Sequence, residues 1–155
     1  MSAIENILFP VDLTESAEKL VPHVAIMVEK FDAQLHILFV VRIFQYFTNI
    51  YVPNPSIDLF ETELVEGGRK KMDEFVKTHF SHIDSVKSEV ILGDPSDAII
   101  SYVNNNNIDM TIMGTHGRKG IDRVIFGSVA ERVIKFASVP VLVINPHRHR
   151  SKKED

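Results

Sequence analysis

The chain alternates between short, continuously apolar runs and longer stretches in which apolar residues return at helical spacing. The apolar runs predict five buried strands, at residues 6–11, 35–41, 86–92, 110–113 and 141–144. The longer stretches predict four helices, from Thr14 or Ser16 to about residue 31, at 57–80, from residue 95 to the asparagines at 104–107, and at 128–137. This alternation predicts an α/β, doubly wound fold with a five-stranded parallel sheet and helices on both faces.

Special residues set the limits of the second and third predicted helices. Asp94 and Pro95 indicate a helix start, because aspartate is a good N-cap residue and proline suits the first helical position. Gly67 and Gly68 fall inside the second predicted helix and predict a weak point there. Residues 42–56, which include prolines and aromatic residues, are predicted to form an irregular loop.

The composition is typical of one globular domain. The 155 residues are 45% hydrophobic and 25% charged, without a signal-peptide pattern or an apolar run long enough to span a membrane. The absence of cysteine excludes disulfides and thiolate metal sites. We expect a single cytoplasmic domain at residues 1–146, followed by a basic, mobile tail at 147–155.

The net charge of −4 is unevenly distributed along the chain. The tail carries four basic side chains against two acidic ones, so the remaining body is more acidic than the whole chain. An acidic body disfavours binding to the phosphates of nucleic acids. We therefore expect neither a nucleic acid nor a membrane as a partner.

The order of the strands decides where a ligand would bind. Parallel sheets of this class bind ligands beyond the carboxyl ends of their strands, where the strand order reverses. If the order is 3-2-1-4-5, this crevice lies between the first and fourth strands. Asp12 follows the first predicted strand and Gly114 follows the fourth, so the two residues are predicted to lie on either side of the crevice.

The segment after the fourth predicted strand has the features of a phosphate-binding loop. It contains Gly114-Thr115-His116-Gly117 and, after nine intervening residues, Gly127-Ser128 at a predicted helix start. Glycines let backbone amides approach an anion, and the first turn of a helix adds unpaired amides. Arg118, Lys119 and Arg123 can add positive charge. The segment predicts an anion site.

Each of these residues also has an ordinary structural explanation. The glycines could form tight turns, and Gly127-Ser128 could be only a helix cap. Asp12 could be a helix-start residue, and core packing explains Val40 and Met113 equally well. The functional interpretation rests on the occurrence of all these features at one predicted location.

The spacing Gly-x2-Gly-x9-Gly-Ser resembles the ATP-binding signature of the universal stress protein family, and the resemblance extends over nearly the whole chain. It implies the strand order 3-2-1-4-5. It also implies an adenine pocket of Pro10, Val40 and Met113, with Asp12 bonding the ribose or adenine. Gly114 and Gly117 would admit the inner phosphates, and Gly127, Ser128 and Val129 would hold the outer ones. The expected binding residues are Pro10, Val11, Asp12, Val40, Met113, Gly114, His116, Gly117, Arg118, Gly127, Ser128 and Val129.

The resemblance implies ATP as the ligand, with ADP or AMP as possible alternatives. One histidine, His116, is insufficient for a protein metal site, so Mg²⁺ or Mn²⁺ would be held mainly by phosphate oxygens and water. The other histidines show no metal-ligand spacing and are expected at the surface; they are His23, His36, His79, His82, His147 and His149.

The sequence favours a nucleotide-responsive stress or regulatory protein over a rapid enzyme. The loop supplies cations, but no acid or amide is clearly placed to activate a nucleophile, so at most slow ATP hydrolysis or self-phosphorylation is expected. An adenylyl-transferring or ATP-hydrolysing enzyme of related architecture is an alternative, although the turn after the first strand lacks the expected motif. A receiver-like, phospho-accepting domain is a weaker alternative, because Asp12 has no acidic neighbour there.

The last predicted strand, Val141–Ile144, lies at the edge of the sheet in this strand order. An exposed apolar edge invites pairing with another chain. The resemblance implies a homodimer through this strand, and the alternative is that residues 42–56 of the same chain cover it.

Overall fold

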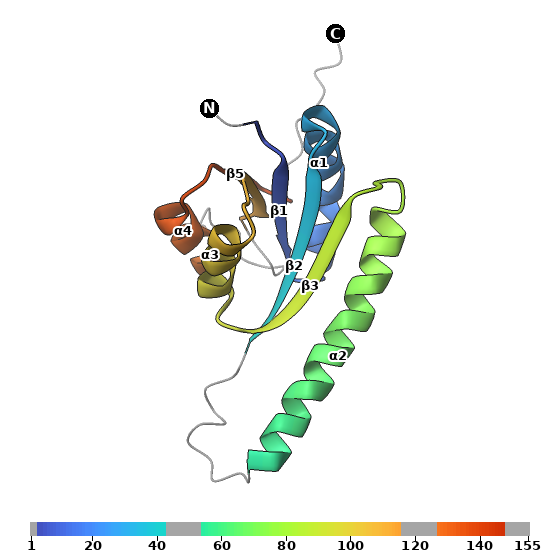
Figure 1. Cartoon of the computed structure of the whole chain (residues 1–155), viewed down its shortest axis with the longest axis vertical. Coiled ribbons are helices and arrows are strands. Elements are labelled where there is room, and N and C mark those ends of the chain that lie inside the picture. Colours follow the sequence, from blue (N-terminus) through green and yellow to red (C-terminus); the bar gives the residue numbers. More distant parts are fainter. Residues whose placement is uncertain (1–2, 43–53, 116–126, 148–155) are drawn as a thin grey trace.

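The computed structural model describes residues 3–42, 54–115 and 127–147. It contains five strands and four helices in strict alternation within this part of the chain (Figure 1). The strands are β1 (Asn6–Val11), β2 (Gln34–Arg42), β3 (Val86–Gly93), β4 (Met110–Gly114) and β5 (Val141–Ile144). The helices are α1 (Glu15–Phe31), α2 (Asn54–His79), α3 (Pro95–Asn105) and α4 (Ser128–Phe136).

The strands form one sheet in the order β3-β2-β1-β4-β5, and every neighbouring pair is parallel. The predicted fold class is therefore confirmed. The chain first adds β2 and β3 on one side of β1 and then adds β4 and β5 on the other side. Because the crossovers are right-handed, this reversal places α1 and α2 on one face of the sheet and α3 and α4 on the opposite face. Two apolar cores result, one on each face of the sheet.

Alternate residues of the central strands supply the two cores. In β1, Ile7 and Phe9 pack with α1 and α2, whereas Leu8 packs with α3 and α4. In β2, Ile37 and Leu38 divide in the same way. Because both faces are covered, these strands are apolar over most of their length, which is the pattern that identified them in the sequence.

The helix α2 differs from its prediction in both its start and its continuity. It begins at Asn54, within the predicted irregular loop, and it continues through Gly67 and Gly68. The backbone of Gly68 is buried against the sheet, and a Cβ there would lie 2.9 Å from Cγ1 of Val90. Glycine at this position therefore permits close helix packing, a requirement that local helix propensity does not reveal.

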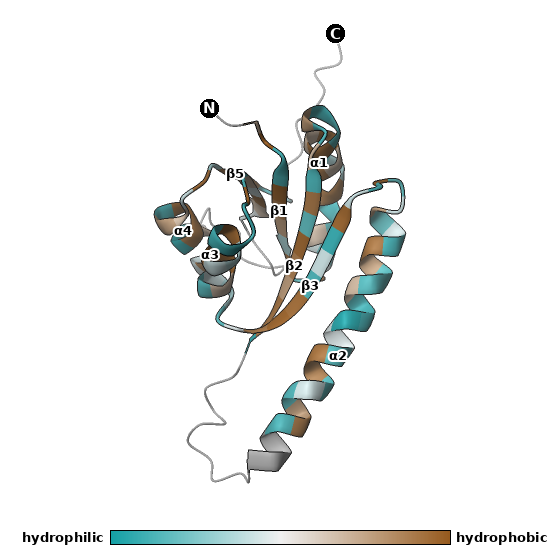
Figure 2. Ribbon diagram, in the orientation of Figure 1, coloured by the Kyte–Doolittle hydropathy of each residue, from teal (hydrophilic) through white to brown (hydrophobic). Residues whose placement is uncertain are grey.

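The N-terminal half of α2 extends past the carboxyl edge of the sheet (Figure 1). Leu64, which the helical pattern places inward, is therefore 37% exposed, whereas Met72 is buried further along the helix. Figure 2 shows hydrophobic and hydrophilic residues alternating along α2, as expected for a helix that buries one side. Within the described residues, no helix is long and apolar enough to cross a membrane.

The other local signals have clear outcomes. Asp94 is the N-cap of α3, where its Oδ1 accepts a hydrogen bond from the backbone N–H of Asp97 at 3.0 Å. Pro95 is the first residue of that helix, as predicted. Of the loop predicted at 42–56, Arg42 belongs to β2 and residues 54–56 belong to α2, while the remainder lies outside the described residues.

Candidate functional site

The sheet separates between β1 and β4 toward its carboxyl edge. Register pairs join Ile7 to Met110 and Leu8 to Thr111, but no pairing follows, although β1 continues to residue 11 and β4 to residue 114. By contrast, β1 stays paired with β2 to its last residue, and β4 stays paired with β5. The reversal of strand order therefore coincides with an opening between two neighbouring strands, which is where sheets of this class bind ligands.

Apolar residues of β1, β2, β4 and α4 lie on the α3 and α4 side of the sheet, and we call Pro10, Val40, Met113 and Val129 the apolar wall. Met113 belongs to the core on that face, and Val40 and Val129 pack against the same core. Pro10 follows the alternation of β1 onto the same face, because Leu8 lies two residues before it. Four residues predicted to contact a nucleotide therefore share one face of the sheet. Core packing accounts for Met113 as well, since its side chain is buried.

Val11 points in the opposite direction. Its side chain belongs to the core formed with α1 and α2 and is 8% exposed. A contact between Val11 and a ligand on the α3 and α4 side would therefore involve its backbone. The alternation of side chains along a strand explains this difference between Val11 and its neighbour Pro10.

Asp12 stands exposed at the end of β1, and Thr14 holds its side chain. The hydroxyl of Thr14 donates a hydrogen bond to Asp12 Oδ1 at 2.6 Å, and the backbone N–H of Thr14 donates to the same oxygen at 3.0 Å. The sequence interpretation missed Thr14 as a partner of Asp12. The spacing of two residues is the available signal, because aspartate side chains commonly bond backbone N–H groups two residues ahead.

Backbone contacts join the end of β4 to the start of α4. The N–H of Gly127 donates to the carbonyl of Thr115 at 2.9 Å, and the N–H of Thr115 donates to the carbonyl of Ile144 at 3.0 Å. A Cβ on Gly127 would lie 3.1 Å from the Thr115 oxygen, so this close approach is one reason for glycine here. The amide of Gly127 is engaged in this contact, which leaves the amides of Ser128 and Val129 in the first turn of α4 for an anion.

Three predicted site residues, His116, Gly117 and Arg118, lie outside the described residues. Gly114 ends β4, and Ser128 is exposed at the first position of α4. Among the residues that the structure describes, no group of three or more histidine or carboxylate side chains could hold a metal ion. An apolar wall, an exposed carboxylate and a helix N-terminus are chemically suited to a flat base, to a hydroxyl or amine donor, and to an anion, respectively.

The prediction that His36 lies at the surface is wrong. His36 is 2% exposed, because its strand β2 is covered on both faces. Its ring Nδ1 lies 3.0 Å from the Tyr102 hydroxyl, and its Nε2 lies 3.3 Å from Oδ1 of Asn6. Burial lowers the pKa of His36, and the positive charge of Lys87 lowers it further. The side chain is thus a neutral, hydrogen-bonded part of the core.

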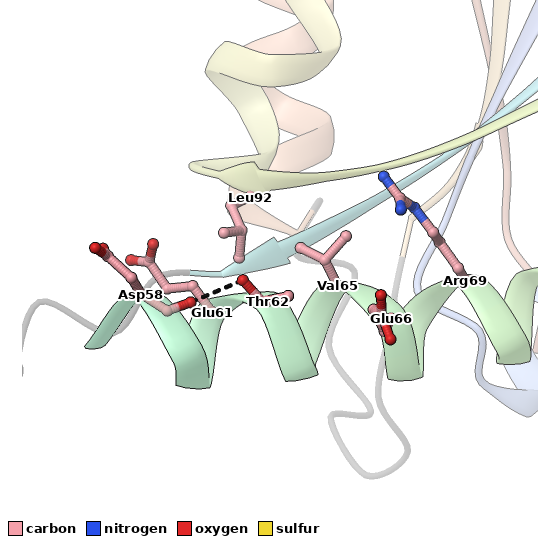
Figure 3. A pocket seen from close by; sticks show the side chains of 7 residues that line it. All are labelled: Asp58, Glu61, Thr62, Val65, Glu66, Arg69 and Leu92. Carbon is pink, nitrogen blue, oxygen red and sulfur yellow. Dashed lines mark hydrogen bonds between the residues drawn. The ribbon is translucent and has the colours of Figure 1, made fainter. Parts of the chain in front are cut away.

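An open groove of about 390 Å³ lies elsewhere, between α2 and the end of β3 (Figure 3). Its lining consists of Asp58, Glu61, Thr62, Val65, Glu66, Arg69 and Leu92. The Thr62 hydroxyl donates to the carbonyl of Asp58 at 2.8 Å. Carboxylates predominate over the one guanidinium, and a triphosphate requires the opposite balance. None of the residues predicted to bind a nucleotide is in this lining, so the groove is separate from the candidate site.

Comparison with known proteins agrees with the doubly wound α/β architecture. The universal stress protein family model matches residues 3–145. Universal stress protein MJ0577 of Methanocaldococcus jannaschii is 30% identical over 152 residues, which cover 90% of this chain and 94% of that protein. Universal stress protein MJ0531 of the same organism is 29% identical, over 97% of this chain and 85% of that protein.

Solved structures share the same fold. The structure of MJ0577 superposes with a TM-score of 0.78 at 27% identity, and covers 97% of this chain and 100% of that one. A more distant universal stress protein, solved in complex with cAMP, has a TM-score of 0.60 at 19% identity and covers 94% of this chain and 99% of its own. The sheet has the doubly wound topology of these structures. The chain belongs to the universal stress protein family.

Proposed function

We propose that this protein binds ATP in the opening between β1 and β4 and acts as a nucleotide-responsive regulatory protein. The observation that carries the proposal is the end of strand pairing at Leu8 and Thr111, which opens the sheet at its point of reversal. The base would lie against the apolar wall of Val40 and Met113. Asp12 would accept a hydrogen bond from the nucleoside.

The phosphate end of the ligand would lie toward α4. The amides of Ser128 and Val129 belong to the first helical turn, where the dipole favours negative charge. The hydroxyl of Ser128 is exposed and can add a donor. Gly114, Gly117 and the basic residue Arg118 would complete the phosphate site. Mg²⁺ or Mn²⁺ would be held mainly by phosphate oxygens and water.

Regulation by bound nucleotide is the proposed role, with at most slow hydrolysis or self-phosphorylation. Rapid phosphoryl transfer requires a positioned base or a group that orients the nucleophile, besides a metal and cations. Among the described residues that are proposed to contact the nucleotide, Asp12 is the carboxylate, and it would lie at the nucleoside end of the ligand, away from the phosphates. ATP is therefore proposed as a bound signal, with ADP or AMP as possible competitors.

The test begins with the ligand itself. Freshly purified protein is denatured by heat, and any released nucleotide is identified by chromatography and mass spectrometry. Calorimetric titration then compares ATP, ADP, AMP and cAMP on the wild-type protein and on Gly117→Val and Ser128→Ala. We expect ATP binding that weakens at least tenfold in both variants. Equal ATP affinity in all three proteins, or its absence from the wild type, would refute the proposed site.

A matched control separates the loss of a contact from a general effect of substitution. Ser101 is exposed on α3, a helix without any of the predicted binding residues, so Ser101→Ala removes a helical serine hydroxyl that the proposal does not use. This variant should bind ATP as the wild type does. Tight binding of acetyl phosphate without nucleotide would favour the receiver-like alternative instead.

We also propose that two copies associate through β5. Among the strands that the structure describes, β5 pairs with β4 alone, and Leu142 on it is 38% exposed. Nearby, Ile134 and Phe136 of α4 are exposed as well. An unpaired apolar edge of this kind is suited to pairing with a second copy. Sedimentation should give a dimer at micromolar concentration, and Leu142→Lys should shift it toward the monomer; a wild-type monomer would contradict the proposal.

A further inference from the structure

The side chain of Asp12 is exposed, yet two hydrogen bonds within the turn between β1 and α1 hold it in place. Both the hydroxyl and the backbone N–H of Thr14 donate to one oxygen, Oδ1, at 2.6 and 3.0 Å. Two donors on one oxygen fix the plane and direction of the carboxylate, because rotation about either side-chain bond would break both contacts.

The side chain of Thr14 does not make the capping hydrogen bond that is common for threonine at the start of a helix. Thr14 is the N-cap residue of α1, with an extended backbone. Threonine at an N-cap normally bonds an amide of the first turn, which stabilises a helix by about 1 kcal/mol. Here the hydroxyl is directed to Asp12 instead.

The residue between them, Leu13, has a backbone φ of 58°, in the left-handed region that leucine rarely adopts. Its side chain packs against the core on the α1 and α2 face, and this packing holds the unfavourable conformation. The backbone of the turn is therefore fixed by the core, and the direction of Asp12 by Thr14.

The second oxygen of Asp12 differs from the first. No described residue donates a hydrogen bond to Oδ2, and Asp12 is exposed at the mouth of the opening between β1 and β4. A carboxylate only accepts hydrogen bonds, so Oδ2 can bond a donor on a ligand and repels an acceptor there. An adenine nucleotide offers two kinds of donor, the ribose hydroxyls and the exocyclic amine of the base.

We propose that Thr14 is a positioning residue that orients Asp12 so that the site selects nucleotides with a hydrogen-bond donor facing Oδ2. The inference rests on the proposed function, because it assigns a role within the same nucleotide site. Thr14 does not contact the nucleotide in this scheme. It acts through Asp12, so its loss should reduce the selectivity among nucleotides while the protein remains folded.

The experiment compares ATP with two analogues that each lack one donor. Deoxy-ATP lacks the ribose 2′-hydroxyl, and inosine triphosphate lacks the exocyclic amine. Calorimetric titrations use the full chain as wild type, Thr14→Val and Thr14→Ser. The wild type should bind ATP about tenfold or more tightly than one of the analogues, since a hydrogen bond to a charged group is lost. Thr14→Val should reduce this preference to threefold or less, and Thr14→Ser should retain it.

Two further variants serve as references. Asp12→Ala should remove the preference altogether. Thr62→Val removes a threonine hydroxyl that bonds the backbone within α2, and it should leave both affinity and preference unchanged. If Thr14→Val does not fold, as judged by circular dichroism, Thr14→Ala takes its place.

The outcomes distinguish this inference from the proposed function. Retention of the full preference in Thr14→Val would overturn the positioning role, while ATP binding itself would stand. A wild type that binds ATP and both analogues equally would also overturn it. A wild type that binds no ATP would refute the proposed function, and the inference with it.

Discussion

Two adjacent glycines of α2 lie in opposite environments, so a methyl group added to each one measures how closely the helix packs on the sheet. A Cβ on Gly68 would lie 2.9 Å from Cγ1 of Val90 and 3.3 Å from Cε1 of Phe39. A Cβ on Gly67 would meet no heavy atom within 4 Å. Gly67→Ala is therefore an internal control for Gly68→Ala.

The two substitutions share one energy term and differ in another. Alanine in place of a helical glycine is more favourable by about 0.5–1 kcal/mol, which Gly67→Ala should gain in full. At Gly68 the gain is opposed by overpacking, which destabilises by about 1–3 kcal/mol. Val90 is branched at Cβ and cannot rotate away easily. Gly68→Ala should therefore lower the free energy of unfolding by about 1 kcal/mol, and the two variants should differ by about 2 kcal/mol.

Urea unfolding followed by circular dichroism provides the measurement. The midpoint should rise for Gly67→Ala and fall for Gly68→Ala, while the dependence on urea concentration stays constant. Val90→Ala removes Cγ1, so adding Gly68→Ala to that background should cause a smaller loss than in the wild type. An equal rise in stability for both alanine variants would refute close packing of α2 at Gly68.

Three other predictions concern polar groups whose surroundings the structure defines. Because burial lowers the pKa of His36, the unfolded chain binds a proton that the native state does not. The free energy of unfolding should fall as the pH drops below about 6.5, by up to about 1.4 kcal/mol per pH unit. Thr111 is fully buried, and its hydroxyl has no hydrogen-bond partner among the described residues, so Thr111→Val should stabilise by about 1–3 kcal/mol. Asp94→Ala removes the cap of α3 and should destabilise by about 1 kcal/mol.

Each of these can be checked by urea unfolding. The pH slope assigned to His36 should disappear in His36→Gln, and an unchanged slope would assign it to other groups. A lower midpoint for Thr111→Val would mean that the hydroxyl has a favourable partner in solution. Asp94→Asn retains a capping residue and should lose less stability than Asp94→Ala; equal losses would contradict the capping role.

Much of the fold was predictable because the signals for it are local. Periodicity identified all nine elements of the described chain, and the Asp94-Pro95 pair located the start of α3 to the residue. The start of α2 was placed too late, since residues 54–56 resemble a loop in composition but belong to a helix. The family signature indicated a nucleotide site, and the structure adds the opening of the sheet beside Asp12.

Local patterns in the sequence specify which segments are strands and helices and which residues lie near the ends of β1 and β4. Those properties depend on neighbours within a few residues, where periodicity and capping operate. Long-range packing is responsible for the burial of His36, for the approach of Gly68 to Val90 and for the direction of Val11, which points away from Pro10's side of the sheet. These properties depend on sheet register and on helices packed from distant parts of the chain, which no local pattern specifies.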